Sequence, residues 1–134
     1  IKKAHQFLIF TVPPALQHGV AYGLNKGDDY FEGFTADMQA KRDFLMKGLK
    51  DVGFGVLDSQ GTYFITCDFR PLGYDCDDVE FCQIMIKEAG VVAIPVSAFY
   101  QTEGAVNHFV RFCFCKREEM MTEAIERMKK AFAK

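Results

Sequence analysis

The run Phe109–Cys115 most constrains the fold, because it is apolar and β-prone apart from one charged residue, Arg111. Both alternating sets of side chains in this run are otherwise hydrophobic, so we expect a strand with protein on both faces. A guanidinium stays protonated, and burying it without a partner is very costly. Arg111 is therefore expected to lie beside an anion. Its planar fork matches a carboxylate, either that of a ligand or one of the chain's own 18 acidic residues.

The elements around this strand follow one another in a regular order. Thr35 is a candidate N-cap for a helix that Gly53 ends, and Asp77 with Glu80 forms a capping box before a second helix that stops at Gly90. Apolar periodicity predicts helices over residues 35–52, 79–89 and 117–132, and strands over residues 54–57, 62–68, 91–94 and 109–115. This order predicts an α+β two-layer sandwich, with helices over one face of a small, largely antiparallel sheet.

Residues 1–30 do not have the sequence pattern expected at the start of a domain. Pro14 suits the first turn of a helix over residues 15–24, but Gly19 and Gly23 each cost about 1 kcal/mol relative to alanine, so this helix needs something to pack on. We therefore expect residues 1–30 to pack loosely or against a second copy of the chain. The chain is expected to be the C-terminal part of a larger protein.

Composition and charge argue against several classes of function. The formal net charge is −2 and the pI is about 5.9, which disfavours nucleic acid or a membrane surface as a partner. No apolar run reaches the ~18 residues of a transmembrane helix. The five cysteines form no C-x-x-C pair and the three histidines lie far apart, so we expect free thiols in a reducing compartment, the cytoplasm, and no metal site. Cys113 and Cys115 are expected to share one face of their strand.

Side chains in a conventional catalytic arrangement are also missing from the sequence. Neither Ser59 nor Ser97 lies in a G-x-S-x-G segment, and there is no glycine-rich phosphate loop. Asp77 and Asp78 are better explained as a helix cap than as an acid pair. Arg111 is therefore the leading candidate for a functional residue, with a structural ion pair as the alternative.

The segments Gly90–Tyr100 and Val110–Lys116 resemble the C-terminal end of the class I pyridoxal-phosphate aminotransferases. The resemblance is closest to the kynurenine and methionine aminotransferase group, also called glutamine transaminase K. Further segments resemble, in order, the stretch after the family's cofactor loop, its R-D-x-L helix, its G-[ST]-Y-F strand and its final helix: residues 4–11, 41–45, 60–64 and 124–128.

The resemblance implies a fold-type I aminotransferase, in which a large domain holds pyridoxal phosphate and a small domain closes over the substrate. Residues 1–30 would be a remnant of the large, cofactor-binding domain, and residues 31–134 the C-terminal small domain. Arg111 stands where the family binds the α-carboxylate of the substrate, which agrees with its expected need for an anion.

Three aromatic residues acquire candidate roles from the same resemblance. Tyr63 and Phe64 lie on the strand that borders the substrate side chain. Phe10 matches a position where the family often lends an aromatic ring to the neighbouring subunit's site, so a homodimer is expected. Core packing is the alternative for all three residues.

The family's Schiff-base lysine, and the aspartate that pairs with its pyridine nitrogen, have no match in this chain. The chain alone is therefore expected to contain no catalytic residue, to bind no pyridoxal phosphate and to be inactive. The parent enzyme is expected to transfer an amino group between an amino acid of the aromatic, kynurenine, methionine or glutamine type and a 2-oxo acid. The alternative is a non-catalytic α+β module that binds an amino acid for regulation.

Overall fold

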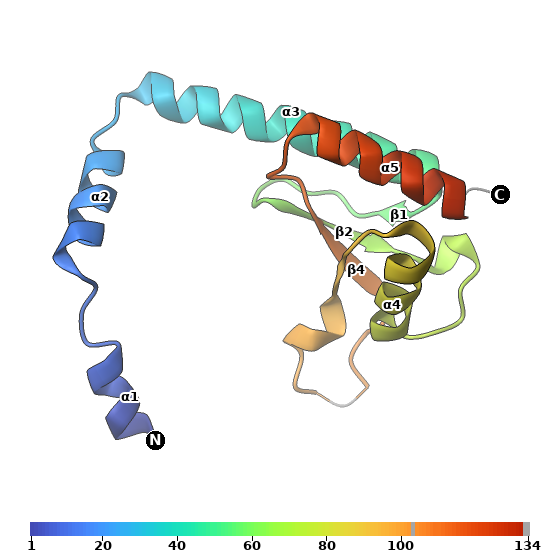
Figure 1. Cartoon of the computed structure of the whole chain (residues 1–134), viewed down its shortest axis with the longest axis horizontal. Helices are drawn as coiled ribbons and strands as arrows, with labels where there is room; N and C mark the ends of the chain where they lie inside the picture. The colour runs from blue at the N-terminus through green and yellow to red at the C-terminus, as the bar shows by residue number, and fades with distance from the viewer. Residues whose placement is uncertain (103, 133–134) are drawn as a thin grey trace. The chain divides into compact units, whose positions relative to one another are not determined.

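The computed structural model describes residues 1–102 and 104–132 of the chain (Figure 1). Contacts between residues group the chain into two compact units, Ile1–Thr35 and Ala36–Lys134. In chain order the elements are α1 (Lys2–Leu8), α2 (Pro14–Leu24), α3 (Asp28–Val52), β1 (Gly55–Val56), β2 (Phe64–Asp68), the 3-10 helix η1 (Arg70–Leu72), α4 (Asp78–Ala89), β3 (Ile94–Pro95), the 3-10 helix η2 (Val96–Phe99), β4 (Phe109–Cys113) and α5 (Glu118–Phe132).

The N-terminal unit is helical and exposes apolar side chains. Pro14 occupies the first turn of α2, as the sequence predicts. Neither α1 nor α2 contains a buried residue, and large apolar side chains such as Phe7, Leu16 and Val20 are exposed. The assignment of residues 1–30 to a separate domain stays a prediction. None of the helices within residues 1–102 and 104–132 is both long enough and apolar enough to cross a membrane.

Helix α3 begins earlier than the sequence suggests. It starts at Asp28, so Thr35 is an exposed residue inside the helix, and the prediction that Thr35 is its N-cap is wrong. Asp28 and Asp29 lie in the first turn, where a carboxylate interacts favourably with the positive end of the helix dipole. The other end is as predicted, because Gly53 follows the helix with φ of 113° and donates its N–H to the Leu49 carbonyl at 3.3 Å.

Four strands form one antiparallel sheet in the order β1-β2-β4-β3. Strands β2 and β4 pair along their whole length, from Phe64 opposite Cys113 to Asp68 opposite Phe109. Strand β3 is shorter than predicted and begins at Ile94. Helices and a small antiparallel sheet together confirm the predicted α+β fold class.

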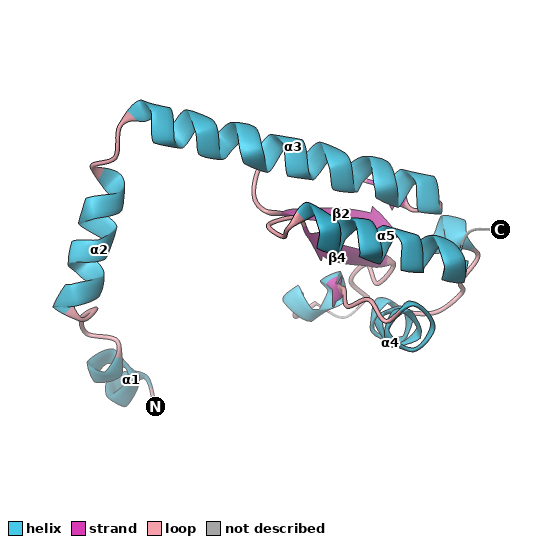
Figure 2. Cartoon of the chain, turned by 45° about the horizontal axis from the view of Figure 1, so that its top comes forward, coloured by secondary structure: helices cyan, strands magenta, loops and turns pink. Residues whose placement is uncertain are grey.

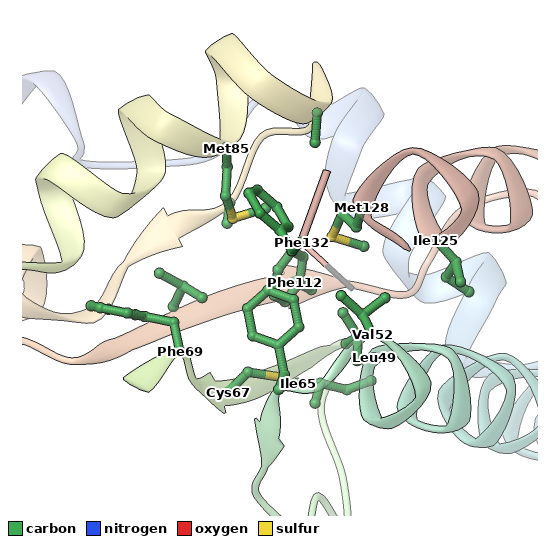
Figure 3. Close-up of a cluster of buried hydrophobic side chains, with 14 of the residues drawn as sticks. Leu49, Val52, Ile65, Cys67, Phe69, Met85, Phe112, Ile125, Met128 and Phe132 are labelled. Atoms are coloured by element: carbon green, nitrogen blue, oxygen red, sulfur yellow. The ribbon is translucent and has the colours of Figure 1, made fainter. Parts of the chain in front are cut away.

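One face of the sheet carries the hydrophobic core. Ile65 and Cys67 of β2 are buried on this face, together with Val110 and Phe112 of β4, and α3, α4 and α5 pack against them. Figure 2 shows α3 and α5 running side by side along the strands, and Figure 3 shows side chains from all three helices gathered around Phe112. The described part of the second unit is therefore a layer of three helices on a sheet.

Helix α3 packs closely against Ile125 of α5 at Gly48. A Cβ atom built at Gly48 would lie 2.7 Å from Cγ1 of the buried Ile125 side chain. We expect Gly48→Ala to lower the free energy of unfolding by up to about 2 kcal/mol, because overpacking costs about 1–3 kcal/mol and the better helix propensity of alanine offsets about 1 kcal/mol. Urea denaturation measures this change.

Gly33 of the same helix provides the matched control. A Cβ atom at Gly33 would meet nothing within 4 Å, so Gly33→Ala should leave the free energy of unfolding unchanged or raise it. Equal effects of the two substitutions would show that α3 and α5 are not closely packed at Gly48.

Candidate functional site

Arg111 lies at the centre of β4, on the face of the sheet that turns away from the core. Its neighbours across the strands are Thr66 on β2 and Ile94 on β3. The sequence predicted protein on both faces of this strand; within the described residues the helices cover one face, and on the other η2 places Phe99 over Arg111 and leaves that face partly exposed. The helices pack against the face that carries Val110 and Phe112. Arg111 is therefore half-buried rather than enclosed.

Two aromatic rings lie against the guanidinium of Arg111. Its Cζ atom is 3.4 Å from the ring centroid of Phe64 and 4.7 Å from that of Phe99. Such cation–π contacts contribute about 0.5–1 kcal/mol at exposed positions and more where water is excluded. Stacking engages the flat side of a guanidinium and leaves its N–H donors at the edge, where they can meet a planar anion.

Arg111 has no acidic partner among the residues that the structure describes. Its Nε atom is buried and has no hydrogen-bond acceptor there. Asp68, on the same face of β2, is bound instead by Arg70, whose Nη2 lies 2.6 Å from Oδ2. That hydrogen bond lowers the pKa of the Asp68 carboxyl. The structural ion pair that the sequence left open is therefore not formed within the described residues, and the buried Nε donor still needs an acceptor.

The structure brings three of the four predicted site residues together. Phe64 stacks on Arg111, and Tyr63, 54% exposed, meets the Phe64 ring edge to face at a centroid distance of 5.6 Å. Phe10 lies in the N-terminal unit and is 80% exposed. The roles of these residues toward a substrate stay predictions.

Phe99 is a site residue that the sequence reasoning missed. It is the last residue of η2 and is 60% exposed, although its ring lies over the guanidinium of Arg111. A single 3-10 turn has no periodic pattern that would reveal its orientation. The available signal was indirect, because η2 directly follows the strand that pairs with Arg111.

A buried carboxylate holds η2 in place. Asp78 is fully buried, and its Oδ2 and Oδ1 atoms accept hydrogen bonds from the Ser97 backbone N–H at 2.7 Å and the Ser97 hydroxyl at 2.6 Å. Of the two aspartates that the sequence assigned to a helix cap, only Asp77 caps α4, through a 2.8 Å bond from the Glu80 N–H. Asp78 instead ties α4 to the turn that carries Phe99.

Two cavities in the second unit are not lined by Arg111. One, of about 310 Å³, lies between residues 90–92, the end of β4 and α5, and another, of about 320 Å³, lies between α3 and α5. Within the described ranges, no three Cys, His, Asp or Glu side chains gather as metal ligands. The arrangement at Arg111 therefore suits recognition of an anion beside an aromatic surface.

Comparison with known proteins shows the family to which the chain belongs. The family model of the class I and II aminotransferases matches residues 1–128. The probable N-succinyldiaminopimelate aminotransferase DapC of Mycobacterium tuberculosis is 41% identical over 136 residues, which cover 96% of this chain and 34% of the relative. The methionine aminotransferase of Escherichia coli is 34% identical over 96% of the chain and 33% of the relative, and human kynurenine–oxoglutarate transaminase 1 is 30% identical over 97% and 35%.

The fold is also similar to a solved structure of this kind. The N-succinyldiaminopimelate aminotransferase of Mycobacterium tuberculosis matches 94% of the chain with a TM-score of 0.85 and 43% identity, over 33% of its own length. The chain therefore spans about a third of the length of these relatives. The resemblance drawn from the sequence is confirmed, and the chain belongs to the class I and II aminotransferase family.

Proposed function

We propose that this chain works as part of a pyridoxal-phosphate-dependent aminotransferase of fold type I, which transfers an amino group between an amino acid and a 2-oxo acid. Residues 31–134 act as the small, substrate-closing domain, and residues 1–30 belong to the large domain. Family membership over residues 1–128 supports the reaction class. The observation that carries the proposal is the guanidinium of Arg111, which is stacked on Phe64 and has a buried Nε donor without a described acceptor.

Arg111 is proposed to bind the α-carboxylate of the substrate. Two parallel N–H···O bonds from a guanidinium fix both the position and the plane of a carboxylate. Because an amino acid and its 2-oxo acid share this carboxylate, one arginine serves both halves of the transfer. Holding the α-carbon in one place brings it repeatedly to the reacting position, which lowers the entropic part of the barrier.

The aromatic residues around Arg111 suggest the class of substrate side chain. Phe64 and Phe99 lie against the guanidinium, Tyr63 meets the Phe64 ring, and all three residues are partly exposed. Such a surface favours aromatic, kynurenine, methionine or glutamine side chains over small ones. The 41% identical relative is named for N-succinyldiaminopimelate, so this amino donor belongs in the same comparison.

A panel of amino donors tests the proposed reaction. The intact enzyme, supplied with pyridoxal phosphate and 2-oxoglutarate, is expected to convert at least one of phenylalanine, kynurenine, methionine, glutamine and N-succinyldiaminopimelate to its oxo acid. Chromatographic detection of glutamate measures the transfer. Binding of these amino acids without any glutamate formed would instead support a non-catalytic module that binds amino acids.

The residues around Arg111 fit a carboxylate but provide no attachment for the cofactor. Its two ring contacts are Phe64 and Phe99, and its neighbours in the sheet are Thr66 and Ile94, so none of these four residues is a lysine that could hold pyridoxal phosphate covalently. When bound, pyridoxal phosphate supplies the electron sink for the transfer. We propose that residues of the parent enzyme outside this chain hold it.

The cofactor assignment predicts the behaviour of the isolated chain. Incubation of residues 1–134 with pyridoxal phosphate, followed by borohydride, should label no single lysine stoichiometrically, because the attachment lysine is proposed to lie elsewhere. Peptide mass spectrometry measures the labelling. One fully labelled lysine in the folded chain, lost on denaturation, would place the cofactor site within these residues.

The exposed apolar surface suggests a partner subunit, and the free thiols suggest a cellular location. The exposed apolar side chains of α1 and α2 must be covered in the working protein, and we propose that a homodimer covers part of them. We propose that Phe10 of each subunit contributes its ring to the substrate site of the neighbouring subunit. All five cysteines are free, which favours the cytoplasm.

A further inference from the structure

Cys113 and Cys115 lie in direct contact at the end of β4. Their Sγ atoms are 3.0 Å apart, and both thiols are free. Cys113 is the last residue of the strand and is half-buried, whereas Cys115 lies beyond the strand and is exposed. A tight turn brings the two together, because the Lys116 N–H donates to the Phe114 carbonyl at 2.8 Å. The sequence predicted that both residues lie on one face of the same strand, and this is wrong, because the strand ends at Cys113 and a turn brings Cys115 back against it.

The other three cysteines are poorer candidates for reaction, and burial raises the pKa even of the half-buried Cys76. Burial raises the pKa of Cys67 to about 12 and that of Cys82 to about 11, so almost none of either thiol is in the reactive thiolate form. Burial, with a hydrogen bond to Cys115, also raises the pKa of Cys113. An oxidant from solution therefore reaches Cys115 first and meets Cys113 second.

We propose that Cys113 and Cys115 form a redox-active dithiol, which a low-molecular-weight disulfide such as oxidised glutathione converts to an intramolecular disulfide. The Cys115 thiolate attacks one sulfur of the oxidant, forming a mixed disulfide and releasing one thiol. The Cys113 thiolate then attacks Sγ of Cys115, the bond to the oxidant's other half breaks, and a second thiol leaves. The protein gives up two electrons and two protons, and the oxidant becomes two thiols.

The dithiol is connected to the Arg111 site through Phe64. Cys113 lies two residues beyond Arg111 on the same face of β4, and it pairs across the sheet with Phe64, whose ring stacks on Arg111. Formation of the disulfide brings the two sulfur atoms closer than 3.0 Å. It therefore moves the end of β4 that pairs with Phe64. If the proposed function is correct, oxidation should therefore weaken the binding of α-carboxylate substrates several-fold, and reduction should restore it.

The sequence makes the oxidised product simple to identify. Trypsin cleaves after Arg111 and after Lys116, so the peptide 112–116 contains both thiols and no other cysteine. The folded intact enzyme is treated with oxidised glutathione, blocked with an alkylating reagent and digested. We expect the peptide 112–116 to lose two hydrogens, to carry no alkyl group, and to return to the dialkylated form after prior treatment with a reductant.

Three controls separate this result from other oxidation products. Cys115→Ser should abolish the internal disulfide, Cys113→Ser should leave a stable glutathione adduct on Cys115, and Cys76→Ser should behave as the wild type. Urea-denatured protein should form the disulfide several-fold more slowly, because the turn that joins the thiols is lost. A lasting adduct on wild-type Cys115, a link to another cysteine, or an equal rate in urea would overturn the proposal.

A kinetic measurement then tests the connection to Arg111. Oxidised wild-type enzyme should show a raised KM for amino-acid substrates, and Cys115→Ser should keep its KM in the same oxidant. Peptide masses report on the dithiol whether or not the enzyme transfers amino groups, so failure of the dithiol and failure of the proposed function remain distinguishable. An oxidised enzyme with unchanged KM would remove the regulatory part of the proposal.

Discussion

Replacement of Arg111 by lysine in the intact enzyme is expected to lower kcat/KM at least tenfold for amino-acid and 2-oxo-acid substrates alike. Both carry the α-carboxylate that Arg111 is proposed to bind. Lysine keeps the charge but loses the two-pronged hydrogen bonding and the flat contact with Phe64. A charge-assisted hydrogen bond contributes about 1.5–3 kcal/mol, and about 1.4 kcal/mol corresponds to a factor of ten, so the loss of one bond is sufficient. Steady-state kinetics with one donor and one acceptor measures the effect.

Arg70→Lys is the matched control for this substitution. Arg70 is an exposed arginine whose ion pair with Asp68 lies at the end of β2. Lysine keeps the charge that pairs with the half-buried Asp68, so kcat/KM should stay unchanged and the melting temperature should change little. A fall in melting temperature with unchanged kcat/KM for Arg111→Lys would make Arg111 a structural residue. The proposed function would then lose its main support.

The sequence identified Arg111 because the relevant signal is local. A single cation inside an apolar, β-prone run predicts both a strand and a need for an anion, and neither conclusion depends on distant residues. The order of helices and strands was predictable for the same reason, since each element has its own periodicity and its own cap. Gly53, Asp77 and Gly90 end or begin their helices as predicted.

The errors and omissions have non-local causes. Thr35 is a good capping residue, but the acidic first turn at Asp28 allows α3 to begin about two turns earlier. The open face of β4 could not be inferred from its composition, because which face meets the helices depends on packing across the whole unit. Phe99 lies against Arg111 because β3 pairs with β4 and the turn of η2 then brings the Phe99 ring over the guanidinium.

Asp78 shows how far such a non-local contact can reach. The residue is adjacent to the helix cap Asp77 in the sequence, and the two carboxylates cannot be distinguished there. In the fold one caps α4 at the surface, and the other is fully buried against Ser97. Through Ser97 the buried carboxylate fixes η2, which carries the Phe99 ring to the guanidinium of Arg111. We therefore propose that Asp78 positions Phe99 beside Arg111.

Asp78→Ala is expected to be among the most destabilising single changes in this unit. It removes two hydrogen bonds to a carboxylate, each contributing about 1.5–3 kcal/mol, and leaves the Ser97 N–H without its acceptor. We expect the free energy of unfolding to fall by about 3 kcal/mol or more. In the intact enzyme, KM for α-carboxylate substrates should rise because η2 no longer holds Phe99 against Arg111. Urea denaturation and steady-state kinetics measure the two effects.

Two further variants separate a positioning role from a general loss of stability. Asp77→Ala removes only the cap and should cost about 1 kcal/mol with no change in KM. Asp78→Asn can still accept from the Ser97 N–H, and its amide can donate to the Ser97 hydroxyl, which is both donor and acceptor. This variant should therefore recover most of the wild-type KM while remaining less stable than the wild type, because its hydrogen bonds are no longer charge-assisted. If Asp78→Ala and Asp77→Ala raised KM equally, the buried contact with Ser97 would have no specific part in positioning Phe99.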